Sequence, residues 1–385
     1  MGYSLPYIIV LLLLGICAFL YEALESEKKK AYAYYCSIAI FIIFFGFRGY
    51  VFTDWTSYAE TLRNISWGDV IQIHSDKSDS IIQEPGFSLL CCLCSMVSRN
   101  IVFLIIVITT IDLLLFLRFL KRWEINNIAF VWIMFIAFEG LNIMFNLLRN
   151  QLAILIFLNA LEYIEKRKPI PYFSLSFLAL SFHMSSFIFF PLYFILHKRL
   201  TRWAFPAIYF SLLIFYLSKA SVLSIIVSIL GLGGVLAAKM KVYTEGYTAT
   251  RELPIVGTFL TIILISFLTI YYDKVTRTFK HRVMAINSLL IYFVFFYVFA
   301  EFKELSSRMS YLFIYPFWVL WIDLTKCLTI KSNRILLCAT LYMFALYTIT
   351  FSMKIPAQQY DNVLFGAKSQ TERLRILNKT YEPEE

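Results

Sequence analysis

The feature that most constrains this chain is the recurrence of long apolar runs along its whole length. Runs such as residues 7–20, 101–117 and 254–271 approach the roughly 17–25 residues that a membrane-spanning helix needs. Hydrophobic residues make up 60% of the chain and charged residues 16%, against about 45–50% and about 25% in soluble domains. The sequence therefore predicts an all-α, polytopic membrane protein with one membrane domain over residues 1–385, in which residues 4–22 are a retained span.

Clusters of lysine and arginine separate the apolar runs and predict the topology. Short basic loops stay on the cytoplasmic side of a membrane, and these clusters are too scattered to form a nucleic-acid-binding face. Placing every cluster inside predicts about twelve transmembrane helices, large outer loops at residues 49–83 and 221–253, and an outer polar tail at 352–385. The clusters lie at residues 28–30, 121–122, 166–168, 198–202, 274–282 and 326–334.

Two apolar segments do not fit a simple series of crossings. If residues 85–98 crossed, the basic residues 166–168 would end outside, so we predict a re-entrant or surface helix there. Residues 171–197 have a basic loop at each end and must go out and come back. We therefore predict two short helices that meet at a polar turn, residues 181–186, where His183 lines a cavity open to the outside.

Ionisable side chains collect at the outer ends of the predicted spans. A charge near the middle of a membrane helix costs about 2.5–3.5 kcal/mol on insertion scales, so each one is a candidate functional residue. Arginines, acids and a histidine at one face predict a site that binds an anion and carries out acid–base chemistry. The residues are Arg48, Asp54, Glu84, Arg149, His183, Glu301, Lys303, Glu304 and Arg308.

Other roles for these side chains remain open. Arg48 and Arg308 lie near span ends, where long cationic side chains also reach lipid headgroups. His183 could instead be a neutral residue that packs between helices. The amides around Arg149 could satisfy its guanidinium or form a sugar-binding face; they are Asn142, Asn146, Asn150 and Gln151.

The sequence gives weaker indications of function for some further polar and aromatic residues. Asp112 and Glu139 lie deeper in their spans, and we predict that they are partners of buried donors. Aromatic side chains in the outer loops could stack on sugar rings; they are Trp55, Tyr58, Trp67, Tyr243 and Tyr247.

The motifs of nucleotide-dependent and zinc-dependent enzymes are absent from the sequence. There is no Walker A loop, no GxGxxG and no HExxH. Cys91 and Cys94 have CxxC spacing, but we interpret them as small hydrophobic residues, because no histidine or carboxylate lies nearby to complete a zinc site. We therefore expect no cofactor or metal, and a substrate that is already activated.

Four short motifs, in order, resemble those of the EpsG family of Wzy-like bacterial polysaccharide polymerases. The chain departs from the family pattern at Thr53, where glycine is usual, at Trp55, where tyrosine is usual, and at Asn150, where glutamine is usual. The likeness is strongest over residues 40–200. The matching stretches are Phe47-Arg48 with 53–58, the Glu-Pro-Gly-Phe of 84–87 with 88–90, residues 146–153, and the Phe-His-Met-Ser of 182–185; a later arginine–tyrosine segment corresponds to Arg308 and Tyr311.

The resemblance implies a GT-C-like membrane glycosyltransferase without a cofactor. Its donor and acceptor would be oligosaccharide repeats on undecaprenyl pyrophosphate. It would be a multi-pass protein of the bacterial plasma membrane, with its active site facing the periplasm or the cell exterior. A repeat-unit flippase and a chain-length regulator are further partners that the resemblance suggests, beside the lipid bilayer.

The residues suit such a reaction. Arginine binds phosphate through bidentate bonds and stays charged, so we expect Arg149 to hold the leaving diphosphate, with Arg48 and Arg308 in support. His183 titrates near neutrality and is the first candidate for general base. Asp54 and Glu84 are alternatives, and Asn146, Asn150, Tyr311, Trp55 and Tyr58 are candidate substrate-binding residues. The rival functions are a membrane-bound O-acyltransferase, a lipid-linked glycan flippase and an O-antigen ligase.

Overall fold

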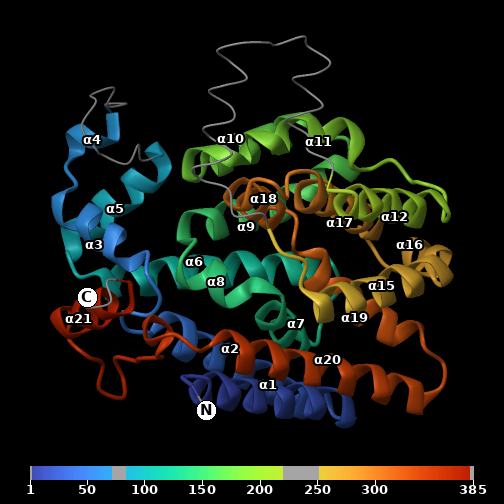
Figure 1. Ribbon diagram of the computed structural model, residues 1–385, viewed down its shortest axis with the longest axis horizontal. Helices are drawn as coiled ribbons and strands as arrows, with labels where there is room; N and C mark the ends of the chain where they lie inside the picture. The colour runs from blue at the N-terminus through green and yellow to red at the C-terminus, as the bar shows by residue number, and fades with distance from the viewer. Residues whose placement is uncertain (1, 72–83, 220–250, 382–385) are drawn as a thin grey trace. The chain divides into compact units, whose positions relative to one another are not determined.

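A computed structural model describes residues 2–71, 84–219 and 251–381. The predictions for Tyr243 and Tyr247 lie outside these residues. In the described part of the chain the secondary structure is helical, apart from one antiparallel β-bridge between Arg48 and Asn362, which confirms the all-α class (Figure 1). The chain divides into two compact units, which are described separately: unit 1 (Met1–Phe190 and Ile330–Glu385) and unit 2 (Pro191–Thr329). The prediction of a single membrane domain stays a prediction.

Unit 1 holds the candidate site and is built around α9, which is buried on almost every side. Leu152, Phe157 and Leu161 on successive turns are at most 1% exposed. A helix that is apolar all round needs neighbours on all sides, and α6, α8 and α10 pack against it. The helices of unit 1 are α1 (Leu5–Ala23), α2 (Glu27–Phe41), α3 (Trp55–Asn64), α4 (Trp67–Ile71), α5 (Pro85–Val97), α6 (Ile101–Arg122), α7 (Ile128–Phe135), α8 (Leu141–Phe145), α9 (Leu148–Glu165), α10 (Pro169–Phe182), α20 (Lys331–Ser352) and α21 (Gln370–Tyr381), while α11 (Phe189–Ile195) runs from unit 1 into unit 2.

Local sequence signals set the ends of these helices. The Asn100 side chain accepts a hydrogen bond from the Val102 backbone N–H (2.9 Å) and begins α6, and Lys121 and Arg122 lie in the last turn, where cations suit the helix dipole. Asn127 begins α7 in the same way. Pro85 occupies the first turn of α5, where its missing N–H leaves no bond unmade.

Within the described residues, four helices are long and apolar enough to cross a membrane, or five if one bent pair is a single span. Shorter apolar helices, including α5 and α10, accompany them. This pattern indicates a membrane protein, and the count of about twelve spans stays a prediction. The four helical segments are Leu5–Ala23, Ile101–Arg122, Ile128–Phe145 and Lys331–Ser352, and the bent pair is Ile255–Ile270 with Tyr272–Thr278.

The predicted break at His183 is confirmed. α10 ends at Phe182, His183 is extended (φ −154°, ψ 119°), and a 3₁₀ turn, Met184–Ile188, follows. The chain then folds back, since the Tyr172 hydroxyl donates to the Phe189 carbonyl (2.5 Å). The segment is therefore a helical hairpin with His183 at its tip.

Two π-helical turns widen helices of unit 1. One, Ile42–Gly46, follows α2, and the other, Ile136–Gly140, separates α7 from α8. At the second turn the backbone leaves helical geometry at Phe138 (φ −116°, ψ 77°) and Glu139 (φ 63°, ψ 1°). Such turns displace main-chain carbonyls from the regular helix pattern and often occur at functional sites.

The polar tail packs onto the end of the α2 segment. The Gly49 N–H donates to the Asp361 carbonyl (2.8 Å), and the Phe52 N–H donates to the Ala357 carbonyl (2.9 Å). Arg373 of α21, which is 2% exposed, donates from Nε to the Tyr50 carbonyl. The described part of the tail is therefore a folded element that holds residues 49–52 in place.

Unit 2 contains a buried ion pair between two of its helices. Arg282 and Asp323 have side chains that are each 1% exposed, and they are joined by two hydrogen bonds of 2.5 and 2.9 Å. A bidentate pair of this kind fixes α17 against α19. The described helices that lie wholly in unit 2 are α12 (Ala204–Leu217), α15 (Ile255–Ile270), α16 (Tyr272–Thr278), α17 (Arg282–Phe293), α18 (Lys303–Tyr311) and α19 (Pro316–Cys327), with a π-helical turn at Val294–Val298.

Candidate active site

Three of the predicted site residues meet in unit 1. Glu84 immediately precedes α5, Arg149 lies in the first turn of α9, and His183 is at the tip of the α10 hairpin. Glu84 Oε2 accepts a hydrogen bond from Arg149 Nη1 at 2.5 Å, and Glu84 Oε1 lies 3.4 Å from His183 Nδ1. The Met184 backbone N–H also donates to Glu84 Oε1 (3.2 Å). One carboxylate thus contacts Arg149, 65 positions later in the chain, and Met184, 100 positions later.

A glycine allows this approach. A Cβ atom on Gly86 would lie 2.3 Å from Ser181 Oγ and 2.9 Å from the Ser181 carbonyl oxygen, closer than real Cβ contacts. The start of α5 therefore touches the end of α10 only because residue 86 has no side chain. This contact brings Glu84 to the hairpin tip and explains why the Glu-Pro-Gly-Phe motif suits the site.

The environment keeps the Glu84 carboxyl ionised. Burial alone would raise the pKa of this carboxyl. The hydrogen bond from His183, the Arg149 charge and the backbone N–H groups together lower it by more, so the resulting pKa is about 2. Arg149 also lies over the Phe87 ring, with 5.7 Å between the guanidinium carbon and the ring centroid. Since both oxygens of Glu84 already face donors and its pKa is far below neutrality, this carboxylate is a weak proton acceptor.

Several polar atoms beside this cluster have no partner in the described part of the chain. Buried polar atoms almost always have one, so such atoms point to a ligand or to ordered water. The side chains of Arg149 and His183 are 22% and 14% exposed, which leaves both within reach of a ligand. The unpartnered atoms are Arg149 Nε, His183 Nε2, the side-chain amides of Asn150 and Gln151, and Ser186 Oγ, while His183 Nδ1 has only the Glu84 carboxylate at 3.4 Å.

Asn146 attaches residues 53–58 to the same cluster. Its Oδ1 accepts from the backbone N–H groups of Thr53 (3.1 Å) and Asp54 (3.2 Å), and its carbonyl accepts from the Tyr58 hydroxyl (2.9 Å). The Tyr58 ring packs 5.5 Å from that of Phe87, the residue beneath Arg149. All four motifs of unit 1 therefore contribute residues to one region.

The other candidates of unit 1 are more enclosed. Arg48 is 1% exposed and donates to the Phe45 carbonyl and to the Met144 carbonyl (2.7 Å), so its guanidinium bonds to main-chain oxygens at two helix ends. Trp55 and Tyr58 are 2% and 6% exposed, with rings packed in the core. Sugar stacking by these two rings stays a prediction.

The interpretation of the two deeper acids was wrong within the described residues. Neither carboxylate oxygen of Asp112 has a hydrogen-bond partner there, although the residue is 1% exposed. Glu139 is exposed rather than buried, because the backbone reverses its helical course at this residue. Neither acid therefore hydrogen-bonds to a buried donor within the described residues, although Asp112 interacts electrostatically with the buried Arg48 guanidinium.

In unit 2 the predicted substrate-binding residues Arg308 and Tyr311 differ in exposure. Arg308 has a side chain that is 59% exposed and lies 3.6 Å from Glu304, whereas Tyr311 is 7% exposed. The more enclosed arginine is Arg251, which sequence reasoning missed. Its Nη1 donates to Ser306 (3.2 Å) and Ser310 (2.8 Å), and its guanidinium lies 4.0 Å from the Phe296 ring centroid. An arginine just before the apolar run at 254 was the only available signal.

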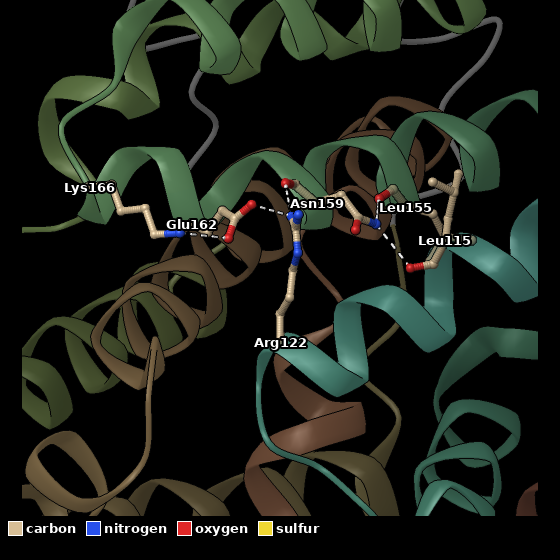
Figure 2. A network of polar contacts seen from close by, with 6 residues as sticks. All are labelled: Leu115, Arg122, Leu155, Asn159, Glu162 and Lys166. Atoms are coloured by element: carbon tan, nitrogen blue, oxygen red, sulfur yellow. Dashed lines mark hydrogen bonds and ion pairs between the residues drawn. The ribbon is translucent and has the colours of Figure 1, made fainter.

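A second polar network holds the far end of α9 to α6 (Figure 2). Glu162 pairs with Arg122 through one oxygen and with Lys166 (3.2 Å) through the other. Asn159 donates to the carbonyls of Leu115 (3.0 Å) and Leu155 (2.9 Å), while its Oδ1 has no partner within the described residues. The basic clusters at 121–122 and 166–168 therefore share one end of unit 1, as the topology prediction requires, and Arg149 lies about 20 Å away at the other end of α9.

A model of the EpsG family matches residues 31–363 of the chain. The chain belongs to the EpsG family. This is the family of Wzy-like polysaccharide polymerases, and the match includes every residue of the Glu84–Arg149–His183 cluster. Searches of curated proteins and of solved structures gave no match. Within the described residues of this EpsG family member, no group of three or more His, Cys, Asp or Glu side chains could hold a metal ion.

Proposed function

We propose that this protein joins oligosaccharide repeats carried on undecaprenyl pyrophosphate, at the outer face of a bacterial plasma membrane, as a GT-C-like glycosyltransferase. EpsG membership supports polysaccharide polymerisation, and the long apolar helices support a membrane setting. The observation that carries the mechanism is the Glu84 bridge. It holds a guanidinium and an imidazole together while Arg149 Nε and His183 Nε2 have no partner within the described residues.

Arg149 binds the diphosphate in this mechanism. The bond between the anomeric carbon and the diphosphate oxygen breaks, and undecaprenyl diphosphate leaves with the bonding electrons. The guanidinium neutralises the charge that develops on that oxygen, and its position is fixed by Glu84 before the reaction begins. Arg48, which bonds to the carbonyls of Phe45 and Met144, positions the neighbouring backbone and does not contact the substrate.

His183 acts as the general base. Its Nδ1 faces the Glu84 carboxylate, so the neutral imidazole carries its proton on Nδ1 and presents a lone pair on Nε2. Nε2 takes the proton from the acceptor hydroxyl as that oxygen bonds to the anomeric carbon. Glu84 is a positioning residue, because its low pKa makes it a poor base. Asp54, held near the cluster by Asn146, is the alternative base.

The test is an assay of the purified full-length protein with a lipid-linked repeat unit, followed by gel separation and mass spectrometry. We expect a ladder of longer glycans and release of undecaprenyl diphosphate. An acyl mass shift would identify an acyltransferase, and unchanged substrate that crosses a vesicle membrane would identify a flippase. Transfer to a lipid A core without a ladder would identify a ligase. Each of these three results would contradict the proposal.

A further inference from the structure

A second polar site lies in unit 1, at the break between α7 and α8. It is a pocket of about 280 Å³, formed where the π-helical turn Ile136–Gly140 meets the end of α20. Apolar side chains make up half of its wall, and polar side chains face it from three segments of the chain. The lining residues that the argument uses are Phe52, Glu139, Asn142, Thr348, Ser352 and Gln358.

Glu139 is the only charged side chain in this wall. It lies within the candidate span Ile128–Phe145, where an ionisable residue is unfavourable and usually functional. Its backbone is left-handed (φ 63°), a conformation that residues other than glycine rarely adopt. No hydrogen bond or ion pair joins its carboxylate to another described residue. Strain and an unpaired charge therefore coincide at one exposed position, which favours a role in binding.

The break is built into the local sequence. A Cβ atom on Gly140 would lie 2.3 Å from the Phe135 carbonyl oxygen, so a larger residue could not follow Glu139 in this backbone. The Phe138 ring packs against Phe344 of α20, with 5.3 Å between centroids. These contacts turn the Glu139 carboxylate out of the helix and keep the pocket open against α20.

The pocket is linked to the catalytic region through two amides. Asn142 lines the pocket, and its Oδ1 accepts a hydrogen bond from Asn146 Nδ2 (3.0 Å). Asn146 in turn holds the backbone of Thr53 and Asp54. Phe52, which lines the pocket, directly precedes this loop. A ligand in the pocket would therefore lie beside the segment that carries Asp54.

The lining selects the chemical class of the ligand. A lone carboxylate repels phosphate, so the lipid diphosphate does not belong here. A hydrocarbon tail would cover Glu139 without pairing it, which is unfavourable. Sugar hydroxyls can donate to a carboxylate and bond to amides and hydroxyls, while the apolar face of the ring packs on Phe52 and the aliphatic wall. The volume is just below the range of about 300–1,000 Å³ for ligand pockets, which fits a single sugar ring.

We propose that this pocket binds one uncharged sugar residue of the glycan, at a position remote from the diphosphate, with Glu139 accepting hydrogen bonds from its hydroxyls. The proposal rests on the proposed polymerase function, since it assigns the pocket to that enzyme's glycan. It adds a specificity site: the pocket would recognise which repeat unit is present, and Arg149 would recognise the leaving group.

Binding is measured with the protein in detergent and with a soluble probe, the oligosaccharide repeat released from the cell's own polysaccharide. We expect Glu139→Gln to raise the dissociation constant about 10- to 100-fold, because the charged acceptor is lost while the size of the side chain is kept. Ser352→Leu, which fills the pocket from α20, should weaken binding similarly. Thr350→Leu is the matched control, on the same helix but outside the lining, and should bind like wild type.

The outcomes separate the two proposals. In chain-growth assays Glu139→Gln should raise the KM for the repeat unit about 10-fold or more and change kcat little. Arg149→Ala should keep oligosaccharide binding and lose chain growth. Equal affinity of wild type, Glu139→Gln and Ser352→Leu would overturn the sugar site, as would displacement by detergent or lipid tails alone. Glu139-dependent binding without a glycan ladder would support the sugar site and contradict the polymerase.

Discussion

The two ends of α9 carry similar charged groups in different states. At the Glu162 end, one carboxylate pairs with Arg122 and Lys166, and every charge has a counter-ion (Figure 2). At the Arg149 end, one carboxylate again faces two cationic or titratable groups, but the guanidinium Nε and the imidazole Nε2 have no partner within the described residues. The comparison teaches that an ion pair alone does not mark a site. Unfilled hydrogen-bonding capacity on the charged and titratable groups themselves does, since at the Glu162 end the unpartnered atom, Asn159 Oδ1, belongs to a neutral amide.

The largest effect is expected from Arg149. Arg149→Ala should lower the rate of chain growth by about 10²–10³-fold, because the charge opposite the leaving diphosphate is lost. Arg149→Lys should recover part of the rate, because lysine restores the positive charge but cannot form the bidentate hydrogen bonds of a guanidinium. The measurement is ladder formation per folded protein, with Arg122→Lys as a matched control at the other end of α9. A wild-type ladder from Arg149→Ala would remove this residue from the mechanism.

His183 should follow closely. His183→Ala is expected to lower kcat about 10²-fold or more, the usual contribution of a general base. In wild type, kcat should fall on acidification, because a protonated imidazole cannot accept the proton of the acceptor hydroxyl, and the variant should lack this dependence. The check is a pH–rate profile of both proteins between about pH 5.5 and 8.5, which is about one and a half pH units on either side of neutrality. Retained activity with an unchanged profile would move the search for the base to Asp54.

Glu84 links the stability of the fold to pH. The folded state lowers the Glu84 pKa from 4.5 to about 2, so its carboxylate stabilises the fold fully above about pH 4.5 and loses this effect as pH falls towards 2. Glu84→Gln should therefore be less stable than wild type at pH 7, and the difference should shrink on acidification. Thermal unfolding in detergent at pH 7 and pH 3.5 (a drop of about 3.5 units) measures this. A difference that is independent of pH would contradict the ion-pair role.

The smallest effect on activity is expected from Arg122. Arg122→Ala removes one partner of a half-buried pair and should lower the free energy of unfolding by about 1–2 kcal/mol. Chain growth per folded molecule should change less than about threefold, because this network is distant from the reacting groups. Denaturation of purified protein, compared with the ladder assay on the same sample, checks both. A loss of rate as large as that of Arg149→Ala would contradict a purely structural role for the Glu162 end of α9.

The sequence predicted the meeting of three side chains better than the structure around them. The helix break at His183 follows from basic loops at both ends of 171–197, and the meeting of Glu84, Arg149 and His183 follows from placing them at one face. The contacts that bring these three side chains together could not be predicted from the sequence. Nothing in the sequence shows that Gly86 must touch Ser181, which is what brings the carboxylate to the hairpin tip.

The failures share a physical cause, since hydrophobic periodicity does not report local breaks in helices. Arg48 was expected to support the diphosphate site, and this role stays a prediction, but the π-helical turn before it presents the Phe45 carbonyl to its guanidinium, which the sequence did not indicate. Glu139 was expected to be buried, but it sits at a left-handed residue beside a pocket. Such backbone departures depend on tertiary contacts, and apolar runs look the same with or without them.

The folded tail has a consequence for the timing of biosynthesis. Gly49 and Phe52 donate hydrogen bonds to Asp361 and Ala357, and Tyr50 accepts one from Arg373; these partners lie more than three hundred positions later in the chain. A ribosome makes the segment beside Asp54 more than three hundred residues before the groups that secure it. The segment beside Asp54 would therefore reach its final position only after residue 373 had been made.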